Sequence, residues 1–155
     1  MAKDDPVNWE IEPIENFLNA HFLYRGIHRI FWINWRDLTK IEPNLFAVPK
    51  PGEEGLSTDW SKYAAPQDTL DRLRIPDLKT NGIIALNVGQ LRTIITINKL
   101  PLNIMHDPIR ISTEILQVNR AHTLIIGMNK QNKAKIKRNL AKIANWADGY
   151  KPIHH

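Results

Sequence analysis

The chain contains no cysteine among its 155 residues. This absence excludes disulfide bonds, zinc sites built from thiolates and a cysteine nucleophile. Long hydrophobic runs are also missing, since no window approaches the ~18 uninterrupted apolar residues of a membrane-spanning helix. The first residues, MAKDDPVNWEIEP, lack the apolar segment of a secretory signal. Together these absences predict a cytoplasmic protein that does not enter a membrane.

Motifs that commonly bind nucleotide phosphates or metal ions are absent as well. Neither Gly-x-x-x-x-Gly-Lys-Ser/Thr nor Gly-x-Gly-x-x-Gly occurs. The histidines are scattered, without the His-x-His or His-x-x-x-His spacing of metal sites. The one local pair, His106 beside Asp107, precedes Pro108 and is typical of a turn. We therefore expect no metal and no bound cofactor.

The length and composition predict one globular domain. Hydrophobic residues make up 43% and charged residues 24% of the chain, and both values are close to the globular average. A chain of this size forms one hydrophobic core. We expect one domain over residues 1–155, with an extended or flexible N-terminus over 1–12 and a flexible tail over 148–155. The terminal His154 and His155 are either native or the remnant of a tag, and we assign them no role.

Local patterns predict three helices. Apolar residues at helical spacing follow Pro13 and predict a helix over residues 13–21. Pro66 opens PQDTLDRL, which has an acidic first turn and a basic end, as the helix dipole favours. The segment 128–147 ends the folded part with a third helix, whose apolar face is formed by Ile136, Leu140, Ile143, Ala144 and Ala147.

The remaining segments are rich in β-branched and aromatic residues. HFLYRGIHRIFWINW predicts one or two strands interrupted at Gly26. Residues 82–97 predict two β-rich runs around Gly89, arranged either as a hairpin or as a strand and a short turn. HTLIIG predicts a strand that ends at Gly127, and the loop 43–66 carries the extended pieces LFAV and LSTDW. Because helices and strands do not alternate regularly, we predict an α+β fold with a mainly antiparallel sheet.

Positive charge is concentrated near the C-terminus. Residues 1–60 carry 6 basic and 10 acidic side chains, whereas residues 61–155 carry 15 basic and 6 acidic ones. The segment 128–147 has no acid, and its cations are Lys130, Lys133, Lys135, Lys137, Arg138 and Lys142. This pattern predicts a basic helix that binds nucleic acid or another polyanion with little sequence selectivity, because lysine attracts phosphates without bidentate recognition. The alternative is a solvated outer face that contributes solubility.

Aromatic residues gather in the acidic first third of the chain. They are Trp9, Phe22, Tyr24, Phe31, Trp32, Trp35 and Phe46. Such residues belong either to the core or to a surface that contacts another protein, because tryptophan and tyrosine dominate interface hot spots. Our first functional interpretation is therefore a non-catalytic accessory subunit or binding module, which contacts protein through this region and a polyanion through the basic helix.

The second interpretation is a small enzyme of the toxin or effector kind. LYRGIHR supplies Tyr24, Arg25, His28 and Arg29 from one expected strand, and NRAH supplies Asn119, Arg120 and His122 from the start of another. If these strands are neighbours, two histidines serve as general acid and base while arginines neutralise a phosphorane-like transition state. That arrangement predicts a metal-independent ribonuclease.

A third pattern uses Arg25 differently. LYRG, followed later by GLST, resembles the arginine and serine-threonine elements of the arginine-serine-glutamate ADP-ribosyltransferases. The resemblance implies that Arg25 holds the phosphates of a nicotinamide dinucleotide, that Ser57 and Thr58 brace the ribose pocket, and that Glu114 is the catalytic acid. Leu116 stands where that family has the partner of the acid.

These interpretations make different structural demands. An enzyme requires one concave pocket in which its residues meet. The two sets are Arg25, His28 and His122 for the ribonuclease, and Arg25, Ser57 and Glu114 for the transferase. A binding module requires only a continuous positive face.

Overall fold

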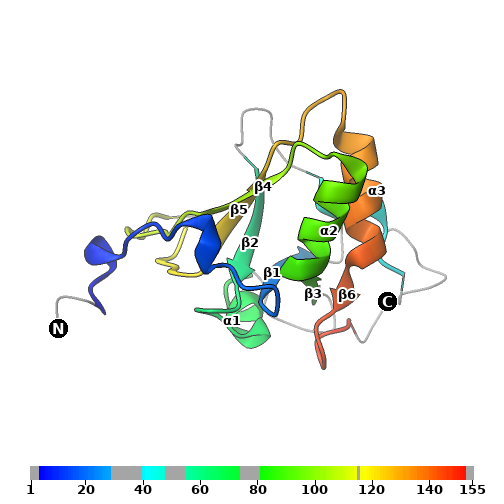
Figure 1. Ribbon diagram of the computed structural model, residues 1–155. Helices are drawn as coiled ribbons and strands as arrows, with labels where there is room; N and C mark the ends of the chain where they lie inside the picture. The colour runs from blue at the N-terminus through cyan, green and yellow to red at the C-terminus, as the bar shows by residue number, and fades with distance from the viewer. Residues whose placement is uncertain (1–3, 29–39, 48–54, 74–80, 115, 153–155) are drawn as a thin grey trace.

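The computed structural model describes residues 4–28, 40–47, 55–73, 81–114 and 116–152. Within these ranges the chain forms a six-stranded antiparallel sheet with the order β4-β5-β2-β1-β3-β6 (Figure 1). The strands are β1 (Phe22–His28), β2 (Leu56–Trp60), β3 (Asn81–Asn87), β4 (Asn103–His106), β5 (His122–Ile126) and β6 (Asn145–Trp146). The helices are α1 (Pro66–Asp71), α2 (Val88–Asn98) and α3 (Lys133–Ile143), with 3-10 turns at Pro6–Asn8, Ile14–Asn16 and Pro43–Phe46. The predicted α+β class is confirmed.

The two faces of the sheet carry different layers. On β3, Ile84 and Leu86 belong to the main core, whereas Ile83 and Ala85 belong to a smaller cluster, because successive strand residues point to opposite faces. Helices α2 and α3 stand side by side over the main core (Figure 1). Helix α1 covers the other face through Leu70. Anything that lies beside α1 is therefore separated by the sheet from α2 and α3.

Helix α3 is docked through an apolar stripe. Ile136 and Leu140 are fully buried in the main core, and each contributes about 1.5–3 kcal/mol by leaving water. The helix ends at Ile143, and the chain then enters β6. Ala147, expected on the helix, lies beyond β6 in the smaller cluster. Only the first part of the predicted apolar face is thus helical.

The helix predicted over residues 13–21 is wrong. One 3-10 turn, Ile14–Asn16, replaces it, and Phe17 leaves it in an extended conformation. Phe17 is buried and stacks on Trp60 with ring centroids 3.9 Å apart. Ile14 and Leu18 are exposed, so their spacing marks no buried helical face. The aromatic contact therefore outweighs the local helical pattern.

The second β-rich run predicted over residues 82–97 is also wrong. The first run is β3, but the second is α2, which begins at Val88 and buries Val88 and Leu91. Asn87 caps this helix, because its side-chain oxygen accepts a hydrogen bond from the backbone nitrogen of Gln90 at 2.9 Å. Asn87 is thus an N-cap residue that signals the start of a helix, although the β-branched residues after it favour a strand.

Other expected elements are confirmed or corrected in detail. The strands LSTDW and HTLII and the helix at Pro66 are present as β2, β5 and α1. LFAV is predicted to be extended, but its first part belongs to a 3-10 turn. Strand β1 continues through Gly26, where a side chain would collide with Leu73. The part of the aromatic strand prediction that includes Phe31, Trp32 and Trp35 lies outside the described residues. Across the described ranges, no helix has the length and apolar character needed to cross a membrane.

Candidate functional site

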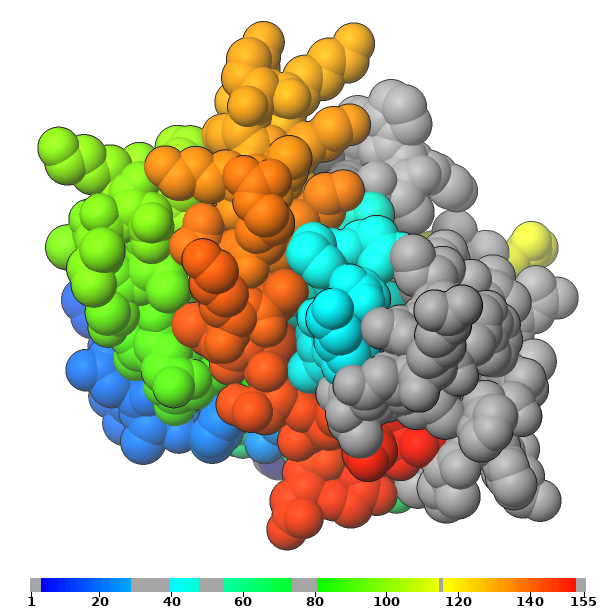
Figure 2. Space-filling model, turned by 90° about the vertical axis from the view of Figure 1, so that its right-hand side faces the viewer, coloured from blue at the N-terminus to red at the C-terminus, as the bar shows by residue number. Residues whose placement is uncertain are grey.

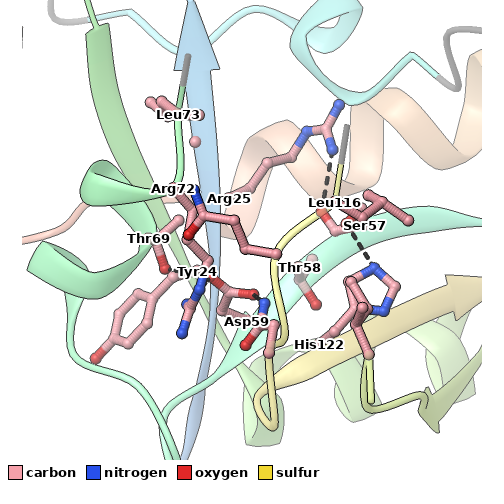
Figure 3. Close-up of a pocket in the computed structure, with 14 residues that line it drawn as sticks. Tyr24, Arg25, Ser57, Thr58, Asp59, Thr69, Arg72, Leu73, Leu116 and His122 are labelled. Atoms are coloured by element: carbon pink, nitrogen blue, oxygen red, sulfur yellow. Dashed lines mark hydrogen bonds and ion pairs between the residues drawn. The ribbon is translucent and has the colours of Figure 1, made fainter. Parts of the chain in front are cut away.

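A pocket of about 270 Å³ lies on the α1 side of the sheet (Figure 3). Strands β1, β2 and β5 form its floor, and α1 with Ile109, Leu116, Gln117 and Asn119 forms its walls. Its volume is just below the usual range for small-molecule sites, about 300–1,000 Å³. The pocket is lined by Tyr24, Arg25, Gly26, Ser57, Thr58, Asp59, Thr69, Arg72, Leu73, Ile109, Leu116, Gln117, Asn119 and His122.

Ser57 and His122 form a hydrogen-bonded pair in this pocket. Strands β2 and β5 run antiparallel with Asp59 opposite His122, so Ser57 and His122 stand diagonally on the same face of the sheet. Ser57 Oγ lies 2.9 Å from His122 Nε2, as the dashed line in Figure 3 marks. The strand register therefore places the two side chains next to each other.

Asp107 fixes the orientation of the His122 ring. His122 Nδ1 lies 2.8 Å from the backbone oxygen of Asp107 and 3.4 Å from its carboxylate Oδ2. Since a carbonyl oxygen only accepts hydrogen bonds, Nδ1 carries the proton in the neutral ring. Nε2 is then the acceptor that faces the Ser57 hydroxyl. This is the arrangement of a serine, a base and a group that orients the base.

A buried polar network holds the floor of the pocket. The Asp59 carboxylate accepts hydrogen bonds from Thr69 at 2.7 Å, Arg72 at 2.9 Å and Asn119 at 2.7 Å. The Asn119 side-chain oxygen in turn accepts a hydrogen bond from the backbone nitrogen of Ala121 at 3.0 Å. Asp59, Thr69 and Asn119 are all buried. Because these bonds join β2, α1 and the segment before β5, they fix the walls relative to the floor.

Arg25 occupies the place where β1 and β2 separate. The two strands have two registered pairs, which end at Tyr24 opposite Asp59. Arg25 Nη1 then donates to the backbone oxygen of Ser57 at 3.1 Å, and its Nε donates to that of Leu45, also at 3.1 Å. A longer bond of 3.4 Å joins its Nη2 to the backbone oxygen of Ala47. Arg25 thus positions the backbone of Ser57 and ties it to the segment 45–47.

The structure brings together only part of each predicted enzyme set. Arg25, Ser57, Thr58 and His122 line the pocket, whereas His28 and Glu114 are not among its lining residues. The Thr58 hydroxyl is buried and donates to the backbone oxygen of Thr123 at 2.9 Å. Glu114 is exposed on the loop that follows β4. The pocket therefore combines Ser57 from one set with His122 from the other.

Sequence reasoning missed Asp59, Arg72 and Asp107. The alternation in LSTDW places Ser57 and Asp59 on one face, and this signal is readable in the sequence. Arg72 and Asp107 come from other elements, and only the tertiary fold brings them to the pocket. Of the NRAH residues, Arg120 lies elsewhere, with its guanidinium carbon 4.3 Å from the Tyr63 ring centroid.

A second cavity of about 690 Å³ lies beside the N-terminal segment. Glu12 lines it and accepts hydrogen bonds from Lys62, Tyr63 and Asn16. Burial by itself raises the pKa of Glu12, but the hydrogen bonds from Lys62 and Tyr63 outweigh this effect and hold the pKa at about 2. Glu12 is therefore an ionised clamp for this segment, and it is unsuited to proton transfer near neutral pH.

The cations of α3 and its approach lie on the opposite side of the sheet from the pocket. Lys137 is half-buried and the others, Lys130, Lys133, Lys135, Arg138 and Lys142, are exposed. None of them forms an ion pair with a described acidic residue. Figure 2 shows α3, in orange, with long side chains that extend from the surface. These cations are therefore separate from the pocket.

Neither comparison with known proteins nor a search for metal-binding geometry identifies a function for this site. No family model, no curated protein and no solved structure matches the chain. In the ranges that the structure describes, no cluster of three or more His, Asp, Glu or Cys side chains has the geometry of a metal site. The functional argument therefore depends on the pocket residues themselves.

Proposed function

We propose that this protein is a small enzyme that cleaves a phosphodiester in a nucleotide-class substrate, with the Ser57 and His122 pocket as its reaction centre. One observation carries the proposal: Ser57 Oγ and His122 Nε2 lie 2.9 Å apart in a pocket that Arg25 and Arg72 also line. Arg25, Ser57 and His122 each belong to an enzyme set predicted from the sequence. Phosphoryl transfer requires a general base beside a hydroxyl group and cationic groups that stabilise the transition state.

The charges of the pocket favour an anionic ligand. Arg25 and Arg72 supply two guanidinium groups, while Asp59 is the one acidic side chain among the described lining residues. The Arg72 side chain remains 27% exposed although Nη1 is bonded to Asp59. A planar guanidinium presents several N–H donors that match phosphate oxygens. Leu73, Ile109 and Leu116 add apolar surface suited to a base or sugar.

Phosphodiester cleavage has better support than ADP-ribosyl transfer. The transferase resemblance implies that Arg25 binds phosphates and that Glu114 acts as the acid. Glu114 lies outside the lining residues, so the acid that the resemblance requires is not in the pocket. In phosphodiester cleavage the base is the His122 imidazole, so the reaction does not require Glu114. Ser57 and Thr58 are the part of the resemblance that the pocket retains.

Turnover assays test this proposal. The protein is incubated with labelled RNA, and separately with labelled nicotinamide dinucleotide, in the presence of a metal chelator. We expect RNA cleavage, and we expect His122→Gln to reduce it by about 10²–10⁴-fold because the general base is removed. Glu114→Gln is the matched control and should leave cleavage unchanged. Dinucleotide turnover that depends on Glu114, or no turnover of either substrate by folded protein, contradicts the proposal.

The basic surface of α3 supports a second, non-catalytic candidate function. Its exposed cations have no described acidic partner, and the helix is docked by Ile136 and Leu140, so a polyanion would meet a fixed positive face. The charge pattern favours nucleic acid bound through its phosphates. In this case the protein serves as an accessory subunit.

The aromatic region gives less support to the protein-contacting half of that candidate. Phe46 is buried in the main core, whereas Phe22 is 38% exposed and stacks on Tyr24 with centroids 6.3 Å apart. Phe22 is therefore the aromatic residue, among those described, that is best placed for a protein partner.

A further inference from the structure

Ser57 differs from the other aliphatic hydroxyl groups of the pocket. Among the described lining residues these groups belong to Ser57, Thr58 and Thr69. The Thr58 hydroxyl is buried and bonded to the backbone oxygen of Thr123, and the Thr69 hydroxyl is buried and bonded to Asp59. Ser57 is exposed to the pocket and faces a histidine nitrogen that is free to accept its proton. It is the hydroxyl group placed for attack.

The histidine is held for this task. The contact of Nδ1 with the Asp107 backbone oxygen at 2.8 Å leaves Nε2 as the acceptor of the neutral ring, and the Asp107 carboxylate lies 3.4 Å from the same Nδ1. The Ser57 backbone is held on the other side by Arg25. Both reacting side chains are thus fixed before a ligand arrives.

We propose that Ser57 is a covalent nucleophile that forms a phosphoseryl intermediate. This inference rests on the proposed function, but it goes further, because a metal-independent nuclease can instead use the 2′-hydroxyl group of RNA as its nucleophile. A serine nucleophile removes the need for that hydroxyl group. The substrate class then extends to phosphodiesters that lack a 2′-hydroxyl group, including DNA.

The chemical steps balance with water as the second substrate. His122 Nε2 takes the Ser57 proton while Oγ bonds to phosphorus. The bond from phosphorus to the leaving oxygen breaks, and His122 returns the proton to that oxygen. The intermediate is a phosphodiester between Ser57 and the retained part of the substrate, and water attacks its phosphorus and gives a proton to His122. The Oγ–phosphorus bond breaks, and Ser57 recovers its proton from His122. Arg72, held by Asp59 at 2.9 Å, is the lining residue suited to the phosphoryl oxygens.

A fluorophosphonate probe tests the nucleophile without requiring the natural substrate. Attack of Oγ on its phosphorus expels fluoride and leaves a stable adduct, which intact-mass and peptide mass spectrometry locate. We expect one adduct on Ser57, none with Ser57→Ala, and labelling at least about 100-fold slower with His122→Gln. Ser61→Ala, a serine outside the pocket lining, should label at the rate of the wild type. Absence of an adduct on Ser57 in the folded wild-type protein, or equal rates with and without His122, overturns the inference.

Cleavage of a phosphodiester without a 2′-hydroxyl group separates the inference from the proposed function. Bis(p-nitrophenyl) phosphate and a deoxyribonucleotide dimer serve as substrates, and we expect both to be cleaved by the wild type and spared by Ser57→Ala. If RNA is the only substrate cleaved and Ser57 carries no adduct, the claim that Ser57 is a nucleophile is wrong, and the claim of phosphodiesterase activity stands. If Ser57 carries an adduct but neither RNA nor the deoxyribonucleotide dimer is cleaved, the claim of a nucleotide-class substrate is wrong, and the claim that Ser57 is a nucleophile stands.

Discussion

His106 and His122 differ in the hydrogen-bond partners of their ring nitrogens, and this difference indicates different roles. His106 is 1% exposed, its Nδ1 accepts a hydrogen bond from the Glu12 backbone nitrogen at 3.0 Å, and its Nε2 lies 2.7 Å from the Arg120 backbone oxygen. Both ring nitrogens are thus bonded to backbone. In His122 one nitrogen is bonded to backbone and the other faces the pocket serine. His106 joins the N-terminal segment to the domain, whereas His122 presents one ring nitrogen to the pocket, as the proposed proton transfer requires.

The buried position of His106 predicts how stability depends on pH. Desolvation lowers its pKa below the ordinary value of 6.5. The unfolded chain then binds the proton more readily, so His106 contributes full stability above that value and loses it as pH falls below it. We expect the free energy of unfolding, from urea titrations at pH 7.5, 6.5 and 5.5, to decrease toward the lowest pH.

His106→Gln provides the control for that pH dependence. The substitution should cost about 1–3 kcal/mol at pH 7.5, because the buried partners of the ring lose their hydrogen bonds. It should also flatten the pH dependence between 6.5 and 5.5. A wild-type protein that becomes more stable toward pH 5.5, or a variant that keeps the full slope, contradicts this role.

Part of the site is predictable at the residue scale. Arg25, Ser57 and His122 can be selected from the sequence because their chemistry is distinctive. The role of Arg25 cannot be predicted from the sequence. Its bond to the Ser57 backbone arises from the separation of β1 and β2, which no local pattern encodes. Arg72 and Asp107 reach the pocket only through packing of α1 and of the segment after β4.

At the element scale, predictability follows the strength of the local start and stop residues. Helix α1 begins at Pro66, where expected, because proline and the first-turn Asp68 fix its start. The region 13–21 also has a proline, yet the burial of Phe17 against Trp60 pulls the chain out of a helix. In α2 the isoleucines and threonines favour a strand locally, but the Asn87 cap and the burial of Leu91 stabilise the helix.

The charge of α3 gives a prediction at this scale. Replacing Lys133, Lys137 and Lys142 by glutamine should weaken binding to unrelated oligonucleotides to a similar degree. The slope of log K against log salt should become shallower by about 0.9 for each phosphate that the variant no longer neutralises. The fold should survive, because these side chains do not fill the core and their mutual repulsion is removed. Fluorescence anisotropy at several salt concentrations measures the slope.

Lys151→Gln is the matched control for α3. It removes an exposed positive charge outside the helix and should leave the slope nearly unchanged. Weaker binding to one oligonucleotide alone would indicate base recognition. An unchanged slope in the triple variant would show that α3 does not bind phosphates.

At the scale of the whole molecule, the sheet keeps two candidate surfaces apart. The pocket opens on the α1 side, and the cations of α3 lie on the side of the main core (Figure 1). The overall charge asymmetry, from an acidic first part to a basic remainder, is visible in the sequence. That the Ser57 and His122 pair and the basic helix lie on opposite faces depends on the strand order, which local patterns do not reveal.

This separation lets a single titration test the central claim. A ¹⁵N-labelled protein is titrated, at a salt concentration that screens α3, with a phosphorothioate deoxyribonucleotide dimer that resists cleavage. We expect chemical-shift changes at the backbone amides of Ser57, Asn119 and His122, and at the ring nitrogens of His122, with little change along α3. Changes confined to α3, with none in the pocket, would contradict the claim that the pocket is the reaction centre.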